Sequence, residues 1–178
     1  MAHTKISTHN EFTVEHLSVP ASIECAIQNP FTLSLTVSQA NLGSTIAHVS
    51  NVEYLHWIDC ISDLHGNSCG QSRRQLLDQE RMWFVSRHEI DYLAEAFAGD
   101  RLGCATWFSR FGRTTLQRET LIWNRDRDVA VCRASSRWVS WTSSHASQLE
   151  STTHKSSHFN YLRFDPPKAE LYLSSHLR

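Results

Sequence analysis

Three side chains with catalytic potential, Ser44, His48 and Asn51, lie within one short polar segment. A histidine can act as a general base on water or on a nearby serine hydroxyl, and an asparagine amide can orient water or substrate beside it. A serine hydroxyl without such a base is not activated at neutral pH. These residue types could therefore support general-base chemistry, with His48 as the base. The same residues also suit structural roles in a turn and a helix cap.

Carboxylates further along the chain offer other bases for the same chemistry. Asp59 falls on a segment expected to be helical, and Glu89 and Asp91 fall on a later segment expected to be a strand. Carboxylates are ionised at neutral pH and can serve as a base or a nucleophile. We favour His48 as the base, with Asn51 beside it, and we keep Asp59, or else Glu89 or Asp91, as alternative bases. These carboxylates also suit a role as ordinary surface charges.

A helix is expected directly after the polar segment. Ser50 or Asn51 can cap it, because serine and asparagine side chains accept hydrogen bonds from the first backbone N–H groups of a helix. Apolar residues then recur at helical spacing: Val52, Leu55, Ile58, Ile61 and Leu64. The pattern predicts one central helix from near Ser50 to about Leu64. Tyr54 and Trp57 share this helix and suit either the core or a substrate wall.

The rest of the chain predicts a sheet. Residues 31–37 alternate between apolar and polar side chains, and a short second helix is expected near residues 73–78. Four later stretches are rich in β-branched and aromatic residues and bounded by turns: residues 82–93, 102–111, 115–123 and 129–141. This order predicts an α+β fold in which an antiparallel sheet wraps one helix. Aromatic residues such as Trp107 on an outer strand face suggest contact with a partner subunit.

Two stretches of the sequence resemble the hotdog-fold acyl-CoA thioesterases, in the branch that includes 4-hydroxybenzoyl-CoA thioesterase. The family pattern Asp-x-x-Gly-His-Val-Asn-Asn-x-x-Tyr-Leu-x-Trp is in register at six positions: His48, Val49, Asn51, Tyr54, Leu55 and Trp57. The pattern Arg-His-Glu-Ile-Asp-Tyr-Leu, followed by Phe-x-Gly-Asp, begins at Arg87. The resemblance covers about residues 31–141. Ser44 stands where the family carries its catalytic aspartate, Ala47 where it carries glycine, and Ser50 where it carries the first asparagine.

The resemblance implies a hotdog fold and hydrolysis of an acyl-CoA or acyl-carrier-protein thioester. In such enzymes backbone N–H groups at the start of the central helix hold the oxyanion. It implies substrate-binding positions at Val49, Ser50, Tyr54 and His88, and a homodimer or dimer-based tetramer. The alternative, motivated by Ser44, is a non-catalytic hotdog protein that binds acyl groups or serves assembly. A hotdog dehydratase is disfavoured by the strand motif.

Composition excludes several other classes. Lys and Arg total 17 against 18 Asp and Glu, which gives a net charge of −1 and no electrostatic footprint for nucleic acid or a membrane surface. No apolar run is long enough to span a bilayer, so we expect a soluble, cytoplasmic protein. The five cysteines form no CxxC pair and are expected to be thiols.

No metal or cofactor is expected. The eleven histidines include no HExxH motif, and the phosphate-binding patterns GxGxxG and GxxxxGK[ST] are absent. Coenzyme A would enter only as part of the substrate, with its phosphates near surface arginines such as Arg110, Arg113 and Arg118.

The domain prediction has three parts. Residues 1–30 are expected to be an N-terminal extension of low regularity, and residues 31–142 the hotdog domain. Residues 143–178 are expected to form a polar linker and a short C-terminal helix, because Pro166-Pro167 precede an apolar segment.

Overall fold

The computed structural model describes residues 11–43 and 47–142. The predicted C-terminal helix and linker, and Ser44, lie outside these residues. The described part contains six strands: β1 (Phe12–Val14), β2 (Phe31–Thr36), β3 (Arg81–Tyr92), β4 (Arg101–Phe111), β5 (Thr115–Asn124) and β6 (Val129–Thr142). Its helices are the 3-10 helix η1 (Gln39–Asn41), α1 (Asn51–Ser68) and α2 (Arg73–Asp78).

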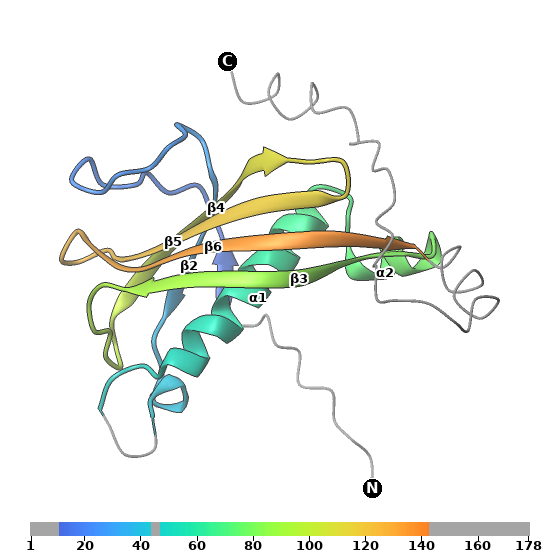
Figure 1. The fold of residues 1–178 in the computed structure, drawn as a ribbon. Helices are drawn as coiled ribbons and strands as arrows, with labels where there is room; N and C mark the ends of the chain where they lie inside the picture. Colours follow the sequence, from blue (N-terminus) through green and yellow to red (C-terminus); the bar gives the residue numbers. More distant parts are fainter. Residues whose placement is uncertain (1–10, 44–46, 143–178) are drawn as a thin grey trace, which may run out of the picture.

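All six strands form one antiparallel sheet in the order β1-β2-β4-β5-β6-β3. The sheet curves around α1, which crosses its concave face (Figure 1). The α+β prediction of one antiparallel sheet around one long helix is therefore confirmed. The predicted strands agree with the observed ones to within one or two residues, and β1 was not predicted.

The limits of α1 follow from local chemistry at its two ends. Ser50 has extended backbone angles, and its hydroxyl accepts a hydrogen bond from the Glu53 N–H at 3.3 Å, so the helix starts at Asn51 as expected. At the other end Gly70 adopts a positive φ of 65° and its N–H bonds to the carbonyl of Asn67. Glycine adopts this left-handed conformation readily and commonly ends helices. The helix therefore runs past Leu64, the end that the apolar pattern predicted.

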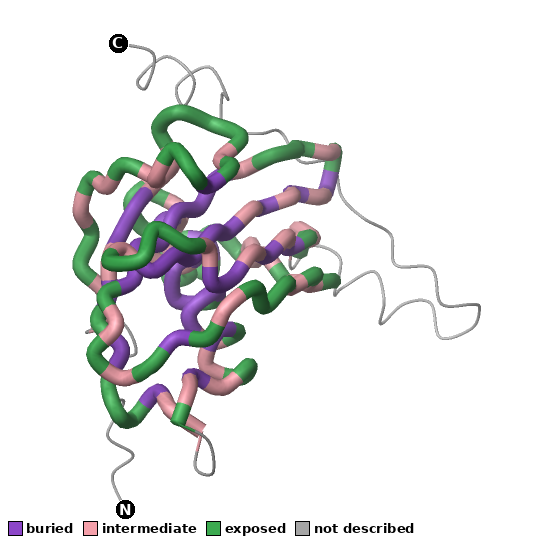
Figure 2. The backbone as a smooth tube through the Cα atoms, turned by 90° about the vertical axis from the view of Figure 1, so that its left-hand side faces the viewer, coloured by how far each residue is buried: buried purple, intermediate pink, exposed green. Residues whose placement is uncertain are grey.

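The main core lies between α1 and the concave face of the sheet. Trp57 and Ile61 on α1 are fully buried and pack against sheet residues such as Leu33 and Cys104. Burying an apolar side chain of this size stabilises the fold by about 1.5–3 kcal/mol. Figure 2 shows the buried residues gathered in the middle of the molecule. This core fixes the position of α1 against the sheet.

A second core covers the opposite face of the sheet. Trp107 and Trp123 on that face are buried against Ile23, with Leu17 and Val19 packed around them. Gly103 makes room for the Trp123 ring, because a Cβ atom there would lie 2.3 Å from the indole. The outer aromatic face that suggested a partner subunit is thus covered by the chain's own N-terminal segment.

None of the helices in the described part combines the length and apolar character needed to cross a bilayer. The five cysteines all lie in the described part and form no disulfide there. Burial raises the pKa of the Cys60 thiol to about 12, so this thiol is protonated at neutral pH.

Candidate functional site

A small cleft of about 240 Å³ opens at the N-terminal end of α1. It is lined by residues that precede and begin the helix and by the segment that follows β3: His48, Val49, Asn51, Tyr54, Tyr92, Leu93, Ala94 and Glu95. The structure therefore brings together four of the residues predicted for the site, namely His48, Val49, Asn51 and Tyr54.

Backbone pairing fixes His48 at the mouth of this cleft. His48 forms an isolated antiparallel bridge with Phe97, and the Val49 N–H donates to the carbonyl of Ala96 at 2.9 Å. The Val49 side chain is buried. The turn before α1 is thus attached to the chain that leaves β3, which places His48 and Glu95 side by side.

The imidazole of His48 is arranged as a base. Its Nδ1 lies 3.0 Å from the carbonyl oxygen of Val49, which can only accept, so Nδ1 carries the proton in this hydrogen bond. The second ring nitrogen, Nε2, is left as the acceptor, and it lies 3.9 Å from a carboxylate oxygen of Glu95. A carboxylate at this distance stabilises the imidazolium that forms when Nε2 takes a proton.

Backbone donors lie beside this imidazole. The Glu53 N–H bonds back to Ser50, and the Val49 N–H is used by Ala96. Within the described residues, the N–H groups of Asn51 and Val52 have no acceptor. Unpaired donors in the first turn of a helix, aided by the helix dipole, favour a negatively charged oxygen.

Two tyrosines form the inner wall of the cleft. Tyr54 is buried, and burial raises the pKa of its hydroxyl, which keeps it neutral. Its ring packs edge-to-face on Tyr92, with centroids 5.6 Å apart. The Tyr92 hydroxyl donates to the carbonyl of Asn51 at 3.3 Å, so β3 also supports the first turn of α1.

The other predicted site residues lie elsewhere. Asp59 is held by Arg73, with 2.7 Å between Oδ1 and Nη2, and the helical rise puts it about 12 Å along α1 from Asn51. Glu89 forms an ion pair with Arg87 on β3. Ser50 is engaged as the helix cap. None of these three lines the small cleft.

His88 faces the middle of α1 rather than its N-terminal end. Its Nδ1 lies 2.8 Å from the hydroxyl of Ser136, its neighbour across β3 and β6. Burial lowers the pKa of His88, while the nearby Asp59 acts in the opposite direction. We therefore place His88 outside the cleft that contains His48.

Sequence reasoning missed Glu95. It lies 47 positions after His48 in the sequence, and no motif spacing joins the two. The bridge between His48 and Phe97 and the hydrogen bond from Val49 to Ala96 bring them together in the fold.

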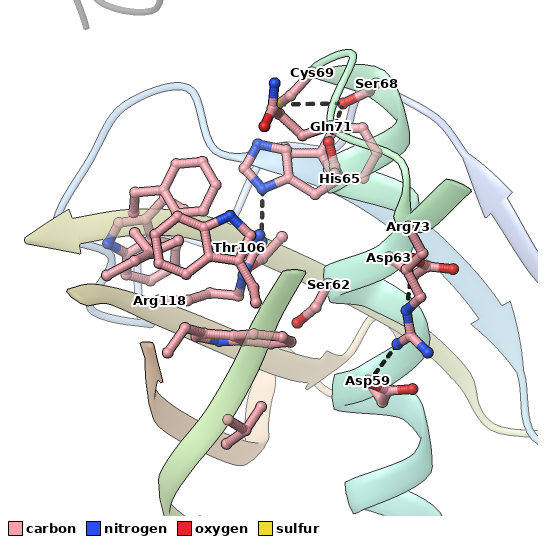
Figure 3. A pocket seen from close by; sticks show the side chains of 18 of the residues that line it. Asp59, Ser62, Asp63, His65, Ser68, Cys69, Gln71, Arg73, Thr106 and Arg118 are labelled. Atoms are coloured by element: carbon pink, nitrogen blue, oxygen red, sulfur yellow. Dashed lines mark hydrogen bonds and ion pairs between the residues drawn. The ribbon is translucent and has the colours of Figure 1, made fainter. Parts of the chain in front are cut away.

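A second, larger cleft of about 1360 Å³ lies beside the C-terminal half of α1 (Figure 3). Asp59 and Asp63 stand on its edge, and Arg73 bridges them. Arg118 lies inside it and is only 5% exposed. The expectation of Arg118 as a surface residue near coenzyme A phosphates is therefore wrong, whereas Arg110 and Arg113 are exposed.

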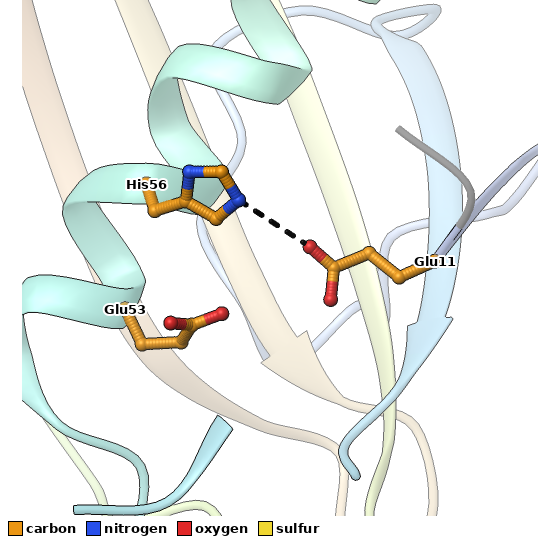
Figure 4. Close-up of side chains that lie close together, drawn as sticks. All are labelled: Glu11, Glu53 and His56. Carbon is orange, nitrogen blue, oxygen red and sulfur yellow. Dashed lines mark ion pairs between the residues drawn. The ribbon is translucent and has the colours of Figure 1, made fainter. Parts of the chain in front are cut away.

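One group of potential metal ligands occurs in the described residues: Glu11, Glu53 and His56 (Figure 4). His56 Nε2 lies 3.8 Å from Glu11. The amide of Asn41 donates to both carboxylates, at 3.2 Å to Glu11 and 2.8 Å to Glu53. The ion pair and the two Asn41 hydrogen bonds explain why these three side chains lie close together, and no bound ion is needed to explain it.

Comparisons with known proteins agree with the fold. Residues 47–131 match the family model of the thioesterase superfamily. A search of curated proteins gave no match. A 1,4-dihydroxy-2-naphthoyl-CoA thioesterase from Synechocystis is 14% identical, with a TM-score of 0.62 over 82% of this chain and 96% of that chain. A DHNA-CoA thioesterase from Staphylococcus aureus is 12% identical, with a TM-score of 0.61 over 81% of this chain and 87% of that chain.

A probable thioesterase from Bartonella henselae is 16% identical, with a TM-score of 0.57 over 64% of this chain and 92% of that chain. At such identities these structures show the fold alone. The hotdog fold and the resemblance to hotdog thioesterases that the motifs indicated are both confirmed.

Proposed function

The chain has the hotdog fold and matches the thioesterase superfamily over residues 47–131, and from this premise we propose that it hydrolyses an acyl-CoA or acyl-carrier-protein thioester at the N-terminal end of α1. One observation carries the proposal. His48 and Asn51, whose backbone N–H has no acceptor among the described residues, line the same small cleft.

The mechanism uses one water molecule. His48 Nε2 takes a proton from the water as its oxygen attacks the thioester carbonyl carbon. The carbonyl oxygen becomes an oxyanion, which the N–H groups of Asn51 and Val52 stabilise. The intermediate then breaks its C–S bond, and the departing thiolate takes the proton from the imidazolium. The products are a carboxylic acid and a thiol, and Glu95 stabilises the imidazolium between the two transfers.

The substrate class rests on similarity. Two of the similar structures are CoA thioesterases, which supports a CoA thioester over other acyl donors. The exposed Arg110 and Arg113 are candidates for contact with the coenzyme phosphates. Coenzyme A belongs to the substrate, and the proposed mechanism needs no further cofactor.

The expected rate is low. Ser44 stands where the resembled family carries an aspartate, so the site would work with His48 but without the family's carboxylate.

An assay on a panel of short, long and aromatic acyl-CoAs tests the proposal. Release of free thiol is measured for the wild type, His48→Ala and Ser44→Asp. We expect slow turnover by the wild type and, with His48 as the base, loss of it in His48→Ala. If the catalytic position is instead simply empty, Ser44→Asp, which restores a carboxylate at the family position, should raise the activity severalfold. If all three folded proteins match the buffer control, the alternative of a non-catalytic acyl-binding or assembly protein replaces this one.

We also propose a homodimer or dimer-based tetramer. β3 is a 12-residue strand at one edge of the sheet. Phe84 and Tyr92 on this strand are about half exposed. Long edge strands can pair with another chain, so β3 is the surface that we assign to the contact. Light scattering at micromolar concentration checks it, and a monomer mass would reject it.

A further inference from the structure

We propose that the large cleft beside the C-terminal half of α1 binds an organic monocarboxylate with a large apolar body, and that its carboxylate pairs with Arg118. This inference is independent of thioester hydrolysis. Asn51 in the small cleft and His65 in the large cleft are 14 residues apart on α1, so the helical rise separates these two residues by about 21 Å.

The walls of the large cleft are mainly apolar. Its lining includes Phe31, Leu76, Phe84, Phe108, Leu116 and Trp138, which come from α2 and five strands. A volume of about 1360 Å³ exceeds the typical range of roughly 300–1000 Å³ for small-molecule sites. The cleft can therefore accept an alkyl chain or a broad ring system.

Arg118 is the charged group inside this apolar space. It lies on β5, opposite Phe108 on β4 and Ser136 on β6. Its Nη1 donates to Nδ1 of His65 at 2.7 Å and to the hydroxyl of Thr106 at 3.3 Å. Its carbon Cζ lies 4.5 Å from the centre of the Phe108 ring, a favourable cation–π contact. Figure 3 shows the side chain reaching from the sheet toward α1.

The charge of Arg118 is not balanced by a carboxylate in the described part of the chain. Both of its hydrogen bonds to described residues start from Nη1, and Nε has no partner there. The two carboxylates on the edge of the cleft, Asp59 and Asp63, are held by Arg73. A buried charge without a partner is costly, and an incoming anion would relieve this cost.

The guanidinium remains charged under ordinary conditions. Burial lowers the pKa of Arg118 to about 10, which still leaves it protonated at neutral pH. A planar guanidinium matches a carboxylate through two parallel hydrogen bonds. One buried cation neutralises one negative charge, so a monocarboxylate fits better than a phosphate dianion, whose second charge would stay unpaired among aromatic rings.

Isothermal titration of the full chain with decanoate at neutral pH tests the proposal. Decan-1-ol is the matched ligand, with the same apolar chain and no charge. Arg118→Met replaces the charged side chain with an apolar one. Arg113→Met makes the same change at an exposed arginine and is the matched control. We expect saturable decanoate binding by the wild type and by Arg113→Met. Loss of hydrogen bonds to a charged group should weaken binding by about 10- to 100-fold. We expect this loss for decanoate binding to Arg118→Met and for decan-1-ol binding to the wild type.

A second measurement needs no variant. The ¹⁵N-labelled Nε–H resonance of Arg118 should move on addition of decanoate and stay in place with decan-1-ol. The proposal is overturned if the wild type shows no saturable binding of decanoate, if the acid and the alcohol bind equally, or if Arg118→Met binds as the wild type does. An unmoved Nε–H resonance at saturating decanoate would also overturn it.

Discussion

The two ends of α1 differ in what they offer a ligand. The N-terminal end borders a cleft of about 240 Å³ with an imidazole and unpaired backbone donors. The C-terminal half borders a cleft of about 1360 Å³ with aromatic walls and a buried guanidinium. The first has the groups for proton transfer and little room, and the second has room and a fixed charge.

The direction of the helix explains part of this difference. Partial positive charge gathers at the start of a helix and partial negative charge at its end. An oxyanion is therefore favoured beside Asn51, and a cation is favoured near His65, which lies in the last turn and bonds to Arg118. One helix thus supports two sites of opposite electrostatic character.

Removing one backbone donor should have a large effect on hydrolysis at the N-terminal end of α1. Asn51→Pro deletes the N–H of the first helical residue, a position where proline is well tolerated. The residue before a proline must be extended, and Ser50 already is, at φ −76° and ψ 154°. Loss of one oxyanion donor lowers kcat by about 10²–10³-fold. Asn51→Ala, which keeps the N–H, is the control in steady-state assays. Equal activities of the two variants would contradict the assignment of this donor.

The cap of α1 gives a smaller, local effect. Ser50→Ala removes the hydroxyl that accepts from Glu53, and such changes reduce the free energy of unfolding by about 1 kcal/mol. Ser18→Ala, at an exposed position, should change it by less than about 0.5 kcal/mol. Urea denaturation followed by fluorescence measures both. A Ser50→Ala variant as stable as Ser18→Ala would mean that the cap contributes little.

The smallest effect is expected between the two ends, at His88. Burial lowers its pKa in the folded chain. As pH falls below about 6.5, the unfolded chain takes up a proton that folded His88 does not, so stability decreases toward acid pH. NMR titration of the imidazole should give a midpoint below 6.5, and His88→Gln should weaken the loss of stability between pH 7 and 5. A midpoint at or above 6.5 would show that Asp59 outweighs burial.

Local patterns predicted most of the sheet and the start of α1. Alternation and turn residues sufficed for β2 to β6, because each of these strands has at least six residues. Ser50 was recognisable as a cap from its residue type. β1 has three residues, and its contact with β2 joins segments that are about 20 residues apart, so no periodic signal predicts it.

The two clefts were harder to predict than the elements that form them. His48 and Asn51 are close in sequence, and motif register was enough to place them in one site. Arg118 and His65 are 53 residues apart, and only the packing of α1 on the sheet joins them. A buried arginine is also contrary to the general tendency of charged residues to be exposed, which is why Arg118 was assigned to the surface.

The most direct test of the account is His48→Ala measured in both assays, with His56→Ala as the matched histidine on α1. We predict that His48→Ala loses acyl-CoA hydrolysis by about 10²–10⁴-fold, as removal of a positioned base should. It should bind decanoate as tightly as the wild type, and His56→Ala should match the wild type in both assays. Hydrolysis that survives in folded His48→Ala at the wild-type rate would contradict the account.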